Sequence, residues 1–571
     1  MSALVRQACR LERGSVLPLT MIAMLLFSVL GFTLVAMGTT ELTISGSWKQ
    51  YSAAFYGAEA GIESAVVALR AILASSPTPT VAQLTGIAPP TLPDPKLSFT
   101  TFTVTRVVPN PPYSYTTTFS TGPYAGFTSQ VTDYLITSEV RGDNGTRSRQ
   151  TQILRYVQLP LFQFGVFYGA GVDLEISPGP SMTFNGRVHS NSNIYVGAGS
   201  TLSFDSTMTS AGTIQRQIKR STAIPWGSDP MIKDAGGTYR PLNFDHTYQP
   251  GFSSTWTPAA WQAQASSTFG NTVRDATMGV GQVIPALPDL FYNPPNPDVI
   301  AHQLIEIANP GDSADLRAAK MYSKSGLRIV NGVATDMGGN PVSLPGGVIT
   351  TQSFFDAREG KTMSVVEVNV GLLGTSGAAP ANGVMYVATT GTPGAAVRLV
   401  NGSQLPAQGL TVVSENPMYI QGDYNTVNKV PAAVLADAVT VLSNQWAANN
   451  SDAKGAMATS TRVASATTIN AALALGPSVE STQANGGNGQ LENNIRFLED
   501  WNGQNFTYQG STVDLWHSQQ ATGQWRCCGS GGGNYYTAPT RIWSYDTLFN
   551  TTMPPGTPQG VLLQRGPWTQ K

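Results

Sequence analysis

A long apolar run near the start of the chain is its strongest hydropathy feature. From Gly14 to Thr40 no residue is charged, and Val16 to Met37 is mostly apolar. At about 1.5 Å of rise per residue, a helix over this run spans roughly 33 Å, enough to cross a hydrocarbon layer of ~30 Å. The pattern predicts one membrane-spanning segment over residues 16–37. The apolar side chains expected to contact lipid include Val16, Leu17, Leu25, Leu26, Leu30, Leu34 and Met37.

Basic residues lie on one side of this apolar segment. Arg6, Arg10 and Arg13 precede it, and no Lys or Arg follows before Lys49. Because basic residues flank membrane spans mainly on the cytoplasmic side, we expect the N-terminal head in the cytoplasm and the rest of the chain outside. A cleaved secretion signal is the alternative, since Ala36–Gly38 is a small-x-small site. The apolar run is, however, longer than the roughly 7–15 residues of such signals.

The helical pattern continues beyond the apolar segment. Six apolar residues recur at i, i+3 and i+4 spacings and form one stripe: Phe55, Ala58, Ile62, Ala65, Val66 and Leu69. The two pieces together predict a single long helix over residues 15–74, with flexible glycines at Gly31, Gly38 and Gly46. The first half of this helix is apolar all round, so we expect it to be buried in lipid or against identical helices.

Short β patterns dominate the chain after the helix. Residues 75–97 are Pro-rich and polar, which indicates a linker. Alternating segments rich in Thr, Val, Ile and Tyr then predict a small β subdomain over residues 98–160. The last two of its strands flank the sequence GDNG, which is typical of a hairpin turn.

The remaining residues, 161–571, predict a large β-rich ectodomain. From Ile176 to Ile214 very short apolar segments alternate with Gly, Asn and Ser, and this texture returns after a less regular insertion at about 216–370. Such short strands with frequent turns favour the stacked rungs of a β-solenoid or a compact roll. The predicted fold class is therefore mainly β with a long N-terminal α-helix: a single membrane-spanning helix and a β-solenoid-like ectodomain with a few short helices.

The amino-acid composition and net charge limit the classes of function that fit this chain. Charged residues make up 12% of the chain, which also contains 58 Gly and 38 Pro. A typical globular protein has about 25% charged residues, so this composition suits a secreted or surface β structure better than a cytosolic enzyme. The net charge of −1 gives no basic footprint for nucleic acid. We expect neither a nucleic-acid partner nor a cofactor.

Cysteine is scarce, which argues against both a disulfide scaffold and a Cys/His zinc site. The three cysteines are Cys9, Cys527 and Cys528. Cys527 and Cys528 are adjacent in sequence, and an exported chain favours their oxidation. A vicinal disulfide, two free thiols and intermolecular pairing all remain open.

Candidate catalytic groups are dispersed along the sequence. The histidines His189, His246, His302 and His517 form no cluster, so each is expected to be structural. Three acids, Glu415, Asp423 and Asp437, could supply a carboxylate pair for glycoside hydrolysis, but nothing in the sequence fixes their separation. No P-loop, G-x-S-x-G or HExxH motif is present. We expect no metal and no enzymatic activity, with a β-helix polysaccharide-degrading enzyme as the weakest alternative.

The N-terminal motifs resemble those of a known family. A basic leader ending at Gly14–Ser15, an uncharged helix and the sequence FYGAEAGIESAVVAL (residues 55–69) resemble type IV pilin-like proteins, most closely the PilX-like minor pilins and pilus assembly proteins. The resemblance implies that residues 1–14 are a leader, cut by prepilin peptidase between Gly14 and Ser15, with methylation of the new terminus. It also implies an inner-membrane anchor, a periplasmic C-terminal domain, assembly into an extracellular pilus (fimbrium), and other minor pilins as partners.

One departure from the family pattern indicates whether the chain is a major or a minor subunit. Major pilins carry Glu at the fifth position after the cleavage site, where this chain has Leu19, preceded by Pro18. Together with the large ectodomain, this departure favours a minor component that acts in assembly or at the filament tip.

A second function is compatible with the C-terminal segment. Its aromatic side chains could bind surface glycans and make the chain an adhesin for cell adhesion, or they could close the end of a β sheet. The residues concerned are Trp501, Trp516, Trp525, Trp543, Trp568, Tyr535 and Tyr536.

Overall fold

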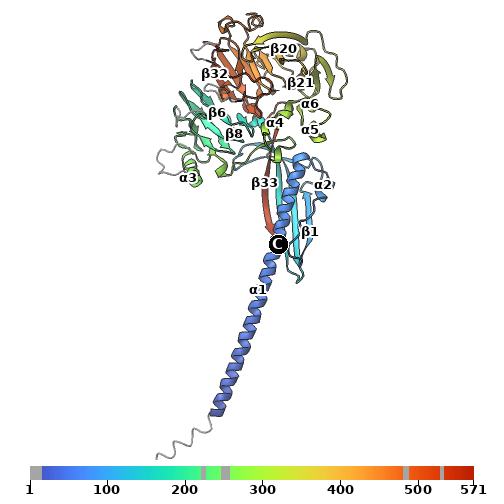
Figure 1. The fold of residues 1–571 in the computed structure, drawn as a ribbon, viewed down its shortest axis with the longest axis vertical. Helices are drawn as coiled ribbons and strands as arrows, with labels where there is room; N and C mark the ends of the chain where they lie inside the picture. The colour runs from blue at the N-terminus through green and yellow to red at the C-terminus, as the bar shows by residue number, and fades with distance from the viewer. Residues whose placement is uncertain (1–15, 220–226, 246–256, 293, 480–487, 528–532) are drawn as a thin grey trace, which may run out of the picture.

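The computed structural model describes residues 16–219, 227–245, 257–292, 294–479, 488–527 and 533–571. A long helix forms the base of the molecule, a small sheet lies beside its upper half, and a large β-rich region lies above both (Figure 1). The predicted class, mainly β with a long N-terminal apolar helix, is confirmed.

Helix α1 (Val16–Ser75) is one continuous helix of 60 residues. It passes through Gly31, Gly38 and Gly46 without a break. Its buried residues begin at Ala54, and none of the residues of its most apolar window is buried. The helix therefore has two halves with different surroundings: an exposed apolar half, and a half packed against protein.

The packed half of α1 approaches a small antiparallel sheet through glycine. A methyl group at Gly61 would overlap the Ser138 hydroxyl and lie 2.8 Å from Phe99 Cε1. At Gly57 the same methyl group would already touch Leu92 and Val140 at 3.3–3.4 Å. One turn apart on the same face of the helix, these two glycines allow the backbone of α1 to lie directly on the sheet.

The small sheet has the strand order β1-β3-β4-β33-β16, and β2 pairs with the other side of β3. Its strands are β1 (Leu97–Arg106), β2 (Tyr115–Thr118), β3 (Thr128–Gly142), β4 (Arg147–Pro160), β16 (Ile284–Pro285) and β33 (Gln559–Gln570). All of these pairs are antiparallel. The segment before it contains the short helix α2 (Val81–Thr85), which Thr80 and Gln83 cap reciprocally.

The position of strand β33 differs from the subdomain boundaries that the sequence predicts. Residues 98–160 alone are predicted as the small β unit, whereas β33 from the far end of the chain is hydrogen-bonded along β4, with Gln559 opposite Pro160. Pairing between strands this far apart in sequence leaves no local periodic signal. The large region, residues 161–558, is thus inserted between two neighbouring strands of the small sheet.

The first part of this insertion is a stack of parallel strands. Leu174 pairs with Ile194, and Ile194 pairs with Ile214, so these two turns of the chain take 20 residues each. The stack has three columns of parallel strands, which also contain longer turns, since Val166 pairs with Val188 and Phe204 pairs with Ile232. They are β5 (Val166–Tyr168), β8 (Val188–Ser190), β11 (Met208–Ser210) and β15 (Val273–Arg274); β6 (Leu174–Ile176), β9 (Ile194–Val196) and β12 (Ile214–Gln215); and β7 (Met182–Phe184), β10 (Leu202–Phe204) and β13 (Met231–Lys233), with β14 (Tyr239–Pro241) antiparallel at the edge.

The second part repeats the arrangement with longer strands. One column contains β17 (Leu327–Val330), β21 (Val384–Ala388), β23 (Leu410–Ser414), β25 (Ala432–Ala436), β28 (Ala472–Ala474) and β31 (Thr512–Asp514), with β18 (Val333–Asp336) antiparallel at its end. A second contains β20 (Lys361–Asn369), β22 (Ala395–Val400), β24 (Met418–Gln421), β26 (Val439–Leu442) and β29 (Arg496–Phe497), with β19 (Ile349–Asp356) antiparallel at its edge. A third contains β27 (Thr467–Asn470), β30 (Asn505–Gly510) and β32 (Thr540–Tyr545).

The two stacks join into one sheet of 11 strands. Strand β31, near the end of the second stack, pairs in parallel with β5, which begins the first stack, with Thr512 opposite Val166. The first stack grows away from this seam, and the second begins at the far end and returns to it. Apolar side chains fill the interior of each stack.

Short helices connect and cover the stacks: α3 (Pro258–Phe269), α4 (Pro297–His302), α5 (Ala314–Ala319), α6 (Met321–Lys324) and α7 (Val370–Thr375). Helices α3–α6 fall in the predicted irregular insertion at about 216–370, but so do strands β13 to β20, which belong to the sheets.

The glycine contact of α1 gives a test of this packing. Replacing Gly61→Leu inserts a side chain where Ser138 and Phe99 leave no room, so we expect the docked half of the helix to be destabilised by about 2 kcal/mol. Hydrogen exchange of the amides of residues 54–74 should then accelerate about 30-fold.

Gly46→Leu is the matched control, because nothing lies within 4 Å of a methyl group at Gly46. It makes the same chemical change in the same helix and should leave exchange over residues 54–74 unchanged. Equal exchange in the two variants would contradict the proposed close contact.

Candidate functional site

The exposed half of α1 is the most distinctive surface of the chain. The seven apolar residues predicted to contact lipid lie on this half and are between 59% and 73% exposed. By length and composition, α1 could cross a membrane, a property that signal sequences near an N-terminus share. Gly14 and Ser15, the predicted processing site, lie outside the described residues, as does the rest of the leader.

Polar contacts fasten the upper half of α1 to the sheet. The guanidinium of Arg565 on β33 binds both carboxylate oxygens of Glu63, at 2.5 and 2.6 Å. The hydrogen bond from Arg565 keeps the pKa of Glu63 below its ordinary value. Both side chains are about half exposed, so this pair contributes little stability. Gln570 donates to the Tyr51 hydroxyl, and Gln150 on β4 donates to the Phe55 carbonyl at 2.9 Å.

The inserted region is attached to the small sheet where the chain leaves and re-enters it, and again through β16, whose Ile284 and Pro285 pair with Val561 and Gly560 of β33. The Leu161 amide donates to the Pro558 carbonyl at 2.9 Å, immediately beyond the pairing of Pro160 with Gln559. Gln163 exchanges two hydrogen bonds with the backbone of Thr128. Entry and exit of the chain are therefore held together, and the inserted region is fixed to the top of the sheet that carries α1.

A buried cluster of titratable groups lies at one edge of the 11-stranded sheet. Asp437 directly follows β25, and Glu415 directly follows β23, so parallel stacking brings both acids to the same edge. His302, at the end of α4, contacts Asp437 at 3.2 Å and Glu306 at 2.8 Å. Glu415 accepts from the Ile307 amide at 2.9 Å. The cluster thus attaches the segment containing α4 to the sheet.

The hydrogen-bonding capacity of the Asp437 carboxylate is occupied by protein groups. It accepts from the Ser518 hydroxyl and from the amides of Gln519, Gln520 and Ala521, in addition to His302. These donors and His302 lower its pKa, against the effect of complete burial.

Asp423 lies elsewhere in the fold. It follows β24 of the other large sheet, and its carboxylate accepts from the Thr468 amide. Of the three acids considered as a glycosidase set, two share the His302 cluster and the third belongs to a different sheet. Their contacts are those of residues that fix turns.

The pKa of His302 is raised to about 9. Burial alone would lower it, and the hydrogen bonds to Asp437 and Glu306 overcome that effect. The imidazolium therefore acts as the cation between two carboxylates.

The other described histidines also have structural contacts. His189 is fully buried, binds Thr209 and Asn191, and stacks on Phe167. Burial lowers its pKa to about 4. His517 binds Asp298 at 2.9 Å, and His246 lies outside the described residues. Within the described part of the chain, no three His, Cys, Asp or Glu side chains are grouped to hold a metal ion.

Most of the C-terminal aromatic residues belong to the core. Trp501, Trp516 and Tyr536 are buried. Trp525 and Trp543 are partly buried and pack on the core of the second stack, and Trp525 donates to the Tyr536 hydroxyl. Trp568, 46% exposed, lies on β33 of the small sheet. The alternative in which these aromatics close a sheet matches their positions better than a glycan-stacking surface does.

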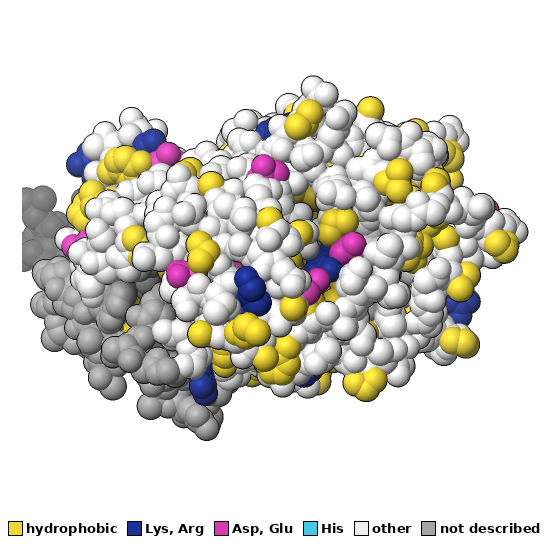
Figure 2. Space-filling view, turned by 90° about the horizontal axis from the view of Figure 1, so that it is seen from above, with side chains coloured by type: hydrophobic (Ala, Val, Ile, Leu, Met, Phe, Trp, Pro, Cys, Tyr) yellow, Lys and Arg dark blue, Asp and Glu magenta, His cyan; other side chains and the backbone are white. Residues whose placement is uncertain are grey.

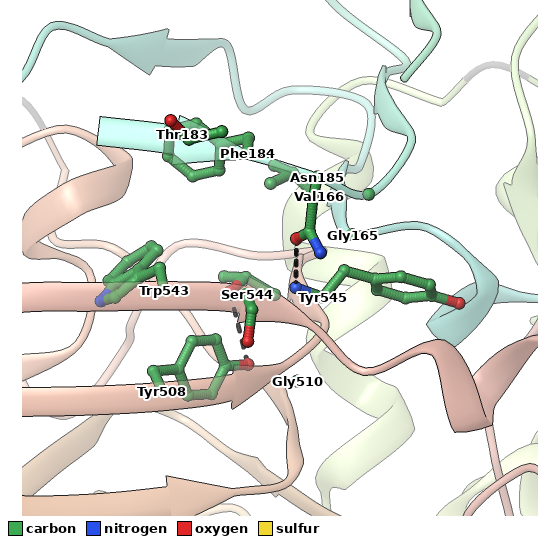
Figure 3. A pocket seen from close by; sticks show the side chains of 12 residues that line it. Gly165, Val166, Thr183, Phe184, Asn185, Tyr508, Gly510, Trp543, Ser544 and Tyr545 are labelled. Carbon is green, nitrogen blue, oxygen red and sulfur yellow. Dashed lines mark hydrogen bonds between the residues drawn. The ribbon is translucent and has the colours of Figure 1, made fainter. Parts of the chain in front are cut away.

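A small gap lies where the two stacks meet. It is lined by Thr183 and Phe184 of β7 and by Tyr508 and Trp543 of β30 and β32 (Figure 3). Asn185 closes it by accepting from the Tyr545 amide at 2.6 Å. Its volume of about 20 Å³ is room for about one water molecule, far below that of a ligand site. This gap is a packing feature of the seam.

The face of the molecule seen from above carries few charged side chains among a mostly uncharged polar surface (Figure 2).

Cys527 is disulfide-bonded. Cys528 lies outside the described residues, so the vicinal pairing stays a prediction.

Comparison with known proteins adds little to this geometry. No protein-family model matches the chain, and no curated protein matches it. Among solved structures, the competence-associated pilin ComZ from Thermus thermophilus is similar, with 12% sequence identity, a TM-score of 0.27, and coverage of 91% of this chain and 97% of ComZ. A likeness this weak establishes neither a shared fold nor a shared function.

The His302 cluster predicts a pH dependence of stability. Because the folded pKa of about 9 exceeds the ordinary value of 6.5, the stabilisation is fully present below about pH 6.5 and is lost as the pH rises to 9. The free energy of unfolding should fall over this window by at most about 3 kcal/mol. Urea unfolding followed by tryptophan fluorescence measures it, and His302→Gln should abolish this part of the fall.

His189→Gln is the matched control. The pKa of His189 is lowered, so its titration affects stability only as the pH falls below about 6.5, and the variant should keep the alkaline loss. Burial also raises the pKa values of three acids, to about 7 for Glu492, about 7 for Glu499 and about 8 for Asp514. Their ionisation likewise lowers the free energy of unfolding as the pH rises. This contribution is the same in every variant, so the difference between the pH profiles of His302→Gln and wild type isolates the contribution of His302. A His302→Gln profile identical to wild type would refute the assignment.

Proposed function

We propose that this chain is a non-enzymatic, pilin-like structural subunit of a type IV pilus or a related machine. Helix α1 carries the proposal: its first half is apolar and exposed, and its second half is docked on an antiparallel sheet. We further propose, from the resemblance of its N-terminal motifs to PilX-like proteins, that prepilin peptidase cuts between Gly14 and Ser15.

The exposed half of α1 requires an apolar environment. Burying apolar surface is worth about 25 cal/mol per Å², so a helix with bare Leu, Met and Phe side chains on all sides is unfavourable in water. A bilayer satisfies this requirement before assembly, and neighbouring helices satisfy it inside a filament. The proposed location is therefore the bacterial inner membrane, with residues 16–37 in the bilayer and the rest in the periplasm, followed by an extracellular pilus.

The large inserted region argues for a terminal position in the filament. We propose that its stacked parallel strands form a β-solenoid-like module. This module sits on the end of the small sheet, beyond the docked half of α1 (Figure 1). A subunit of this shape fits the tip, where nothing follows above it, better than the shaft, where the next subunit would meet the module.

The identity of residue 19, a leucine, also supports a minor rather than a major subunit. The missing Glu at that position sets the chain apart from major pilins, which the resemblance implies carry it. Other minor pilins and assembly proteins are the proposed partners, and the subunit would start or cap the filament.

N-terminal sequencing of the mature protein tests the proposed processing. We expect the mature chain to begin at Ser15 and to keep α1. Gly14→Val should leave the precursor uncut, because a side chain at this position blocks the peptidase subsite implied by the resemblance. Ser15→Ala, a change of one small residue to another, is the control and should still be cut. A mature chain that begins at Thr39 would identify a discarded signal and overturn the proposal.

Position in the filament is tested separately. An antibody against the module should label purified filaments at their ends, with few copies per filament, and deletion of the gene should reduce piliation. Regular labelling along the shaft would contradict a terminal role while leaving the pilin-like architecture intact.

A further inference from the structure

A polar groove crosses the outer face of the sheet formed by β19, β20, β22 and β24. It has a volume of about 370 Å³ and is also lined by the segment 446–452, which follows β26. This size lies within the range of small-molecule binding sites. The groove is separate from α1, from the His302 cluster and from the seam between the stacks.

Arg398 lies at the base of the groove. Its neighbours on β22, Val397 and Leu399, point into the core, so the alternation of a strand directs Arg398 to the opposite face. Its Nε donates to Glu367 on β20 at 2.8 Å, and its two terminal nitrogens bind the two oxygens of Asp452 at 2.8 and 3.1 Å. The Arg398 side chain is only 3% exposed.

These contacts hold two carboxylates in fixed positions. Asp452 is further held by the Trp446 indole, which donates to it at 2.8 Å. Planar, bidentate pairing of this kind restricts both partners, so the carboxylate oxygens are preorganised acceptors. Two acids and one base leave a local charge of −1, which disfavours anionic ligands.

Four side-chain amides surround this fixed centre: Gln352, Asn401, Gln421 and Asn450. Asn401, Gln352 and Asn450 are exposed, and Gln421 is partly exposed. Among the described residues, none of these four amide groups has a hydrogen-bond partner. Each offers two donors and one carbonyl acceptor. The groove therefore presents a row of unused donors and acceptors next to preorganised carboxylates.

We propose that this groove binds a neutral saccharide. A sugar ring carries several hydroxyl groups, each of which donates and accepts, and this matches a site of amides and carboxylates with little apolar surface to receive a hydrocarbon. The local charge of −1 selects against sulfated, phosphorylated and sialylated glycans. This inference does not depend on the proposed role in a filament.

Binding is tested with the full-length chain on an array of neutral and acidic glycans. The chain is kept in a zwitterionic detergent without a sugar headgroup, since a glycosidic detergent would compete for the groove. We expect capture by one or more neutral glycans. Retention of no neutral glycan, or preferential retention of acidic ones, would overturn the proposal.

A double variant locates the site. Asn401 and Asn450 have positive φ angles of 55° and 51°, which glycine adopts without strain. Asn401→Gly with Asn450→Gly therefore removes two unused amides, and affinity for the captured glycan should fall about tenfold or more. Asn271→Gly with Asn428→Gly is the matched control, because it makes the same change at two exposed asparagines with positive φ that do not line the groove. The control should bind like wild type.

Gln352→Ala provides a second, independent variant on the opposite wall. Tryptophan fluorescence unfolding checks that each variant keeps its fold, which is expected because the side chains of Gln352, Asn401 and Asn450 are exposed and make no hydrogen bonds within the described residues. Unchanged glycan affinity in both groove variants would refute the assignment of the groove.

Discussion

The pairing of β4 with β33 is the contact on which the rest of the architecture depends. These neighbouring antiparallel strands hold the two ends of residues 161–558 side by side, with Gln559 opposite Pro160. A large module can be inserted at such a point without disturbing the sheet, because both of its ends already lie one strand spacing apart. The same pairing brings Arg565 to Glu63, so the strand that closes the insertion also fastens the helix.

The different surroundings of the two halves of α1 follow from the size of their side chains. In its upper half, Gly57 and Gly61 remove the Cβ atoms that would keep the helix away from β3. In its lower half, large apolar side chains point outward on all sides and require another apolar partner. A single helix thus joins two environments, and the sheet lies only against the half whose residues are small enough to receive it.

Local sequence patterns predicted the elements better than their partners. The uninterrupted apolar run and the stripe from Phe55 to Leu69 predicted α1, and alternation around GDNG predicted the β3–β4 hairpin. Short segments with regular turns indicated stacked strands, and Leu174, Ile194 and Ile214 now define a 20-residue turn. The attachment of β33 to β4 and of β31 to β5 could not be predicted, because such pairings leave no periodic trace in the chain. The same reason hid the groove, since Glu367, Arg398 and Asp452 meet only after β20 and β22 have paired and the later segment has folded back.

The place of β33 at the end of the described chain has a consequence for biosynthesis. The residues that are synthesised first, α1 and β1 to β4, form an incomplete sheet whose edge at β4 stays open until Gln559–Gln570 are added. Every residue of the module must therefore be synthesised before the small sheet that carries it is completed. A product truncated within the module would keep an unpaired edge strand at β4, a feature that favours aggregation and proteolysis. The fold in this way distinguishes finished from unfinished chains before either could be built into a larger structure.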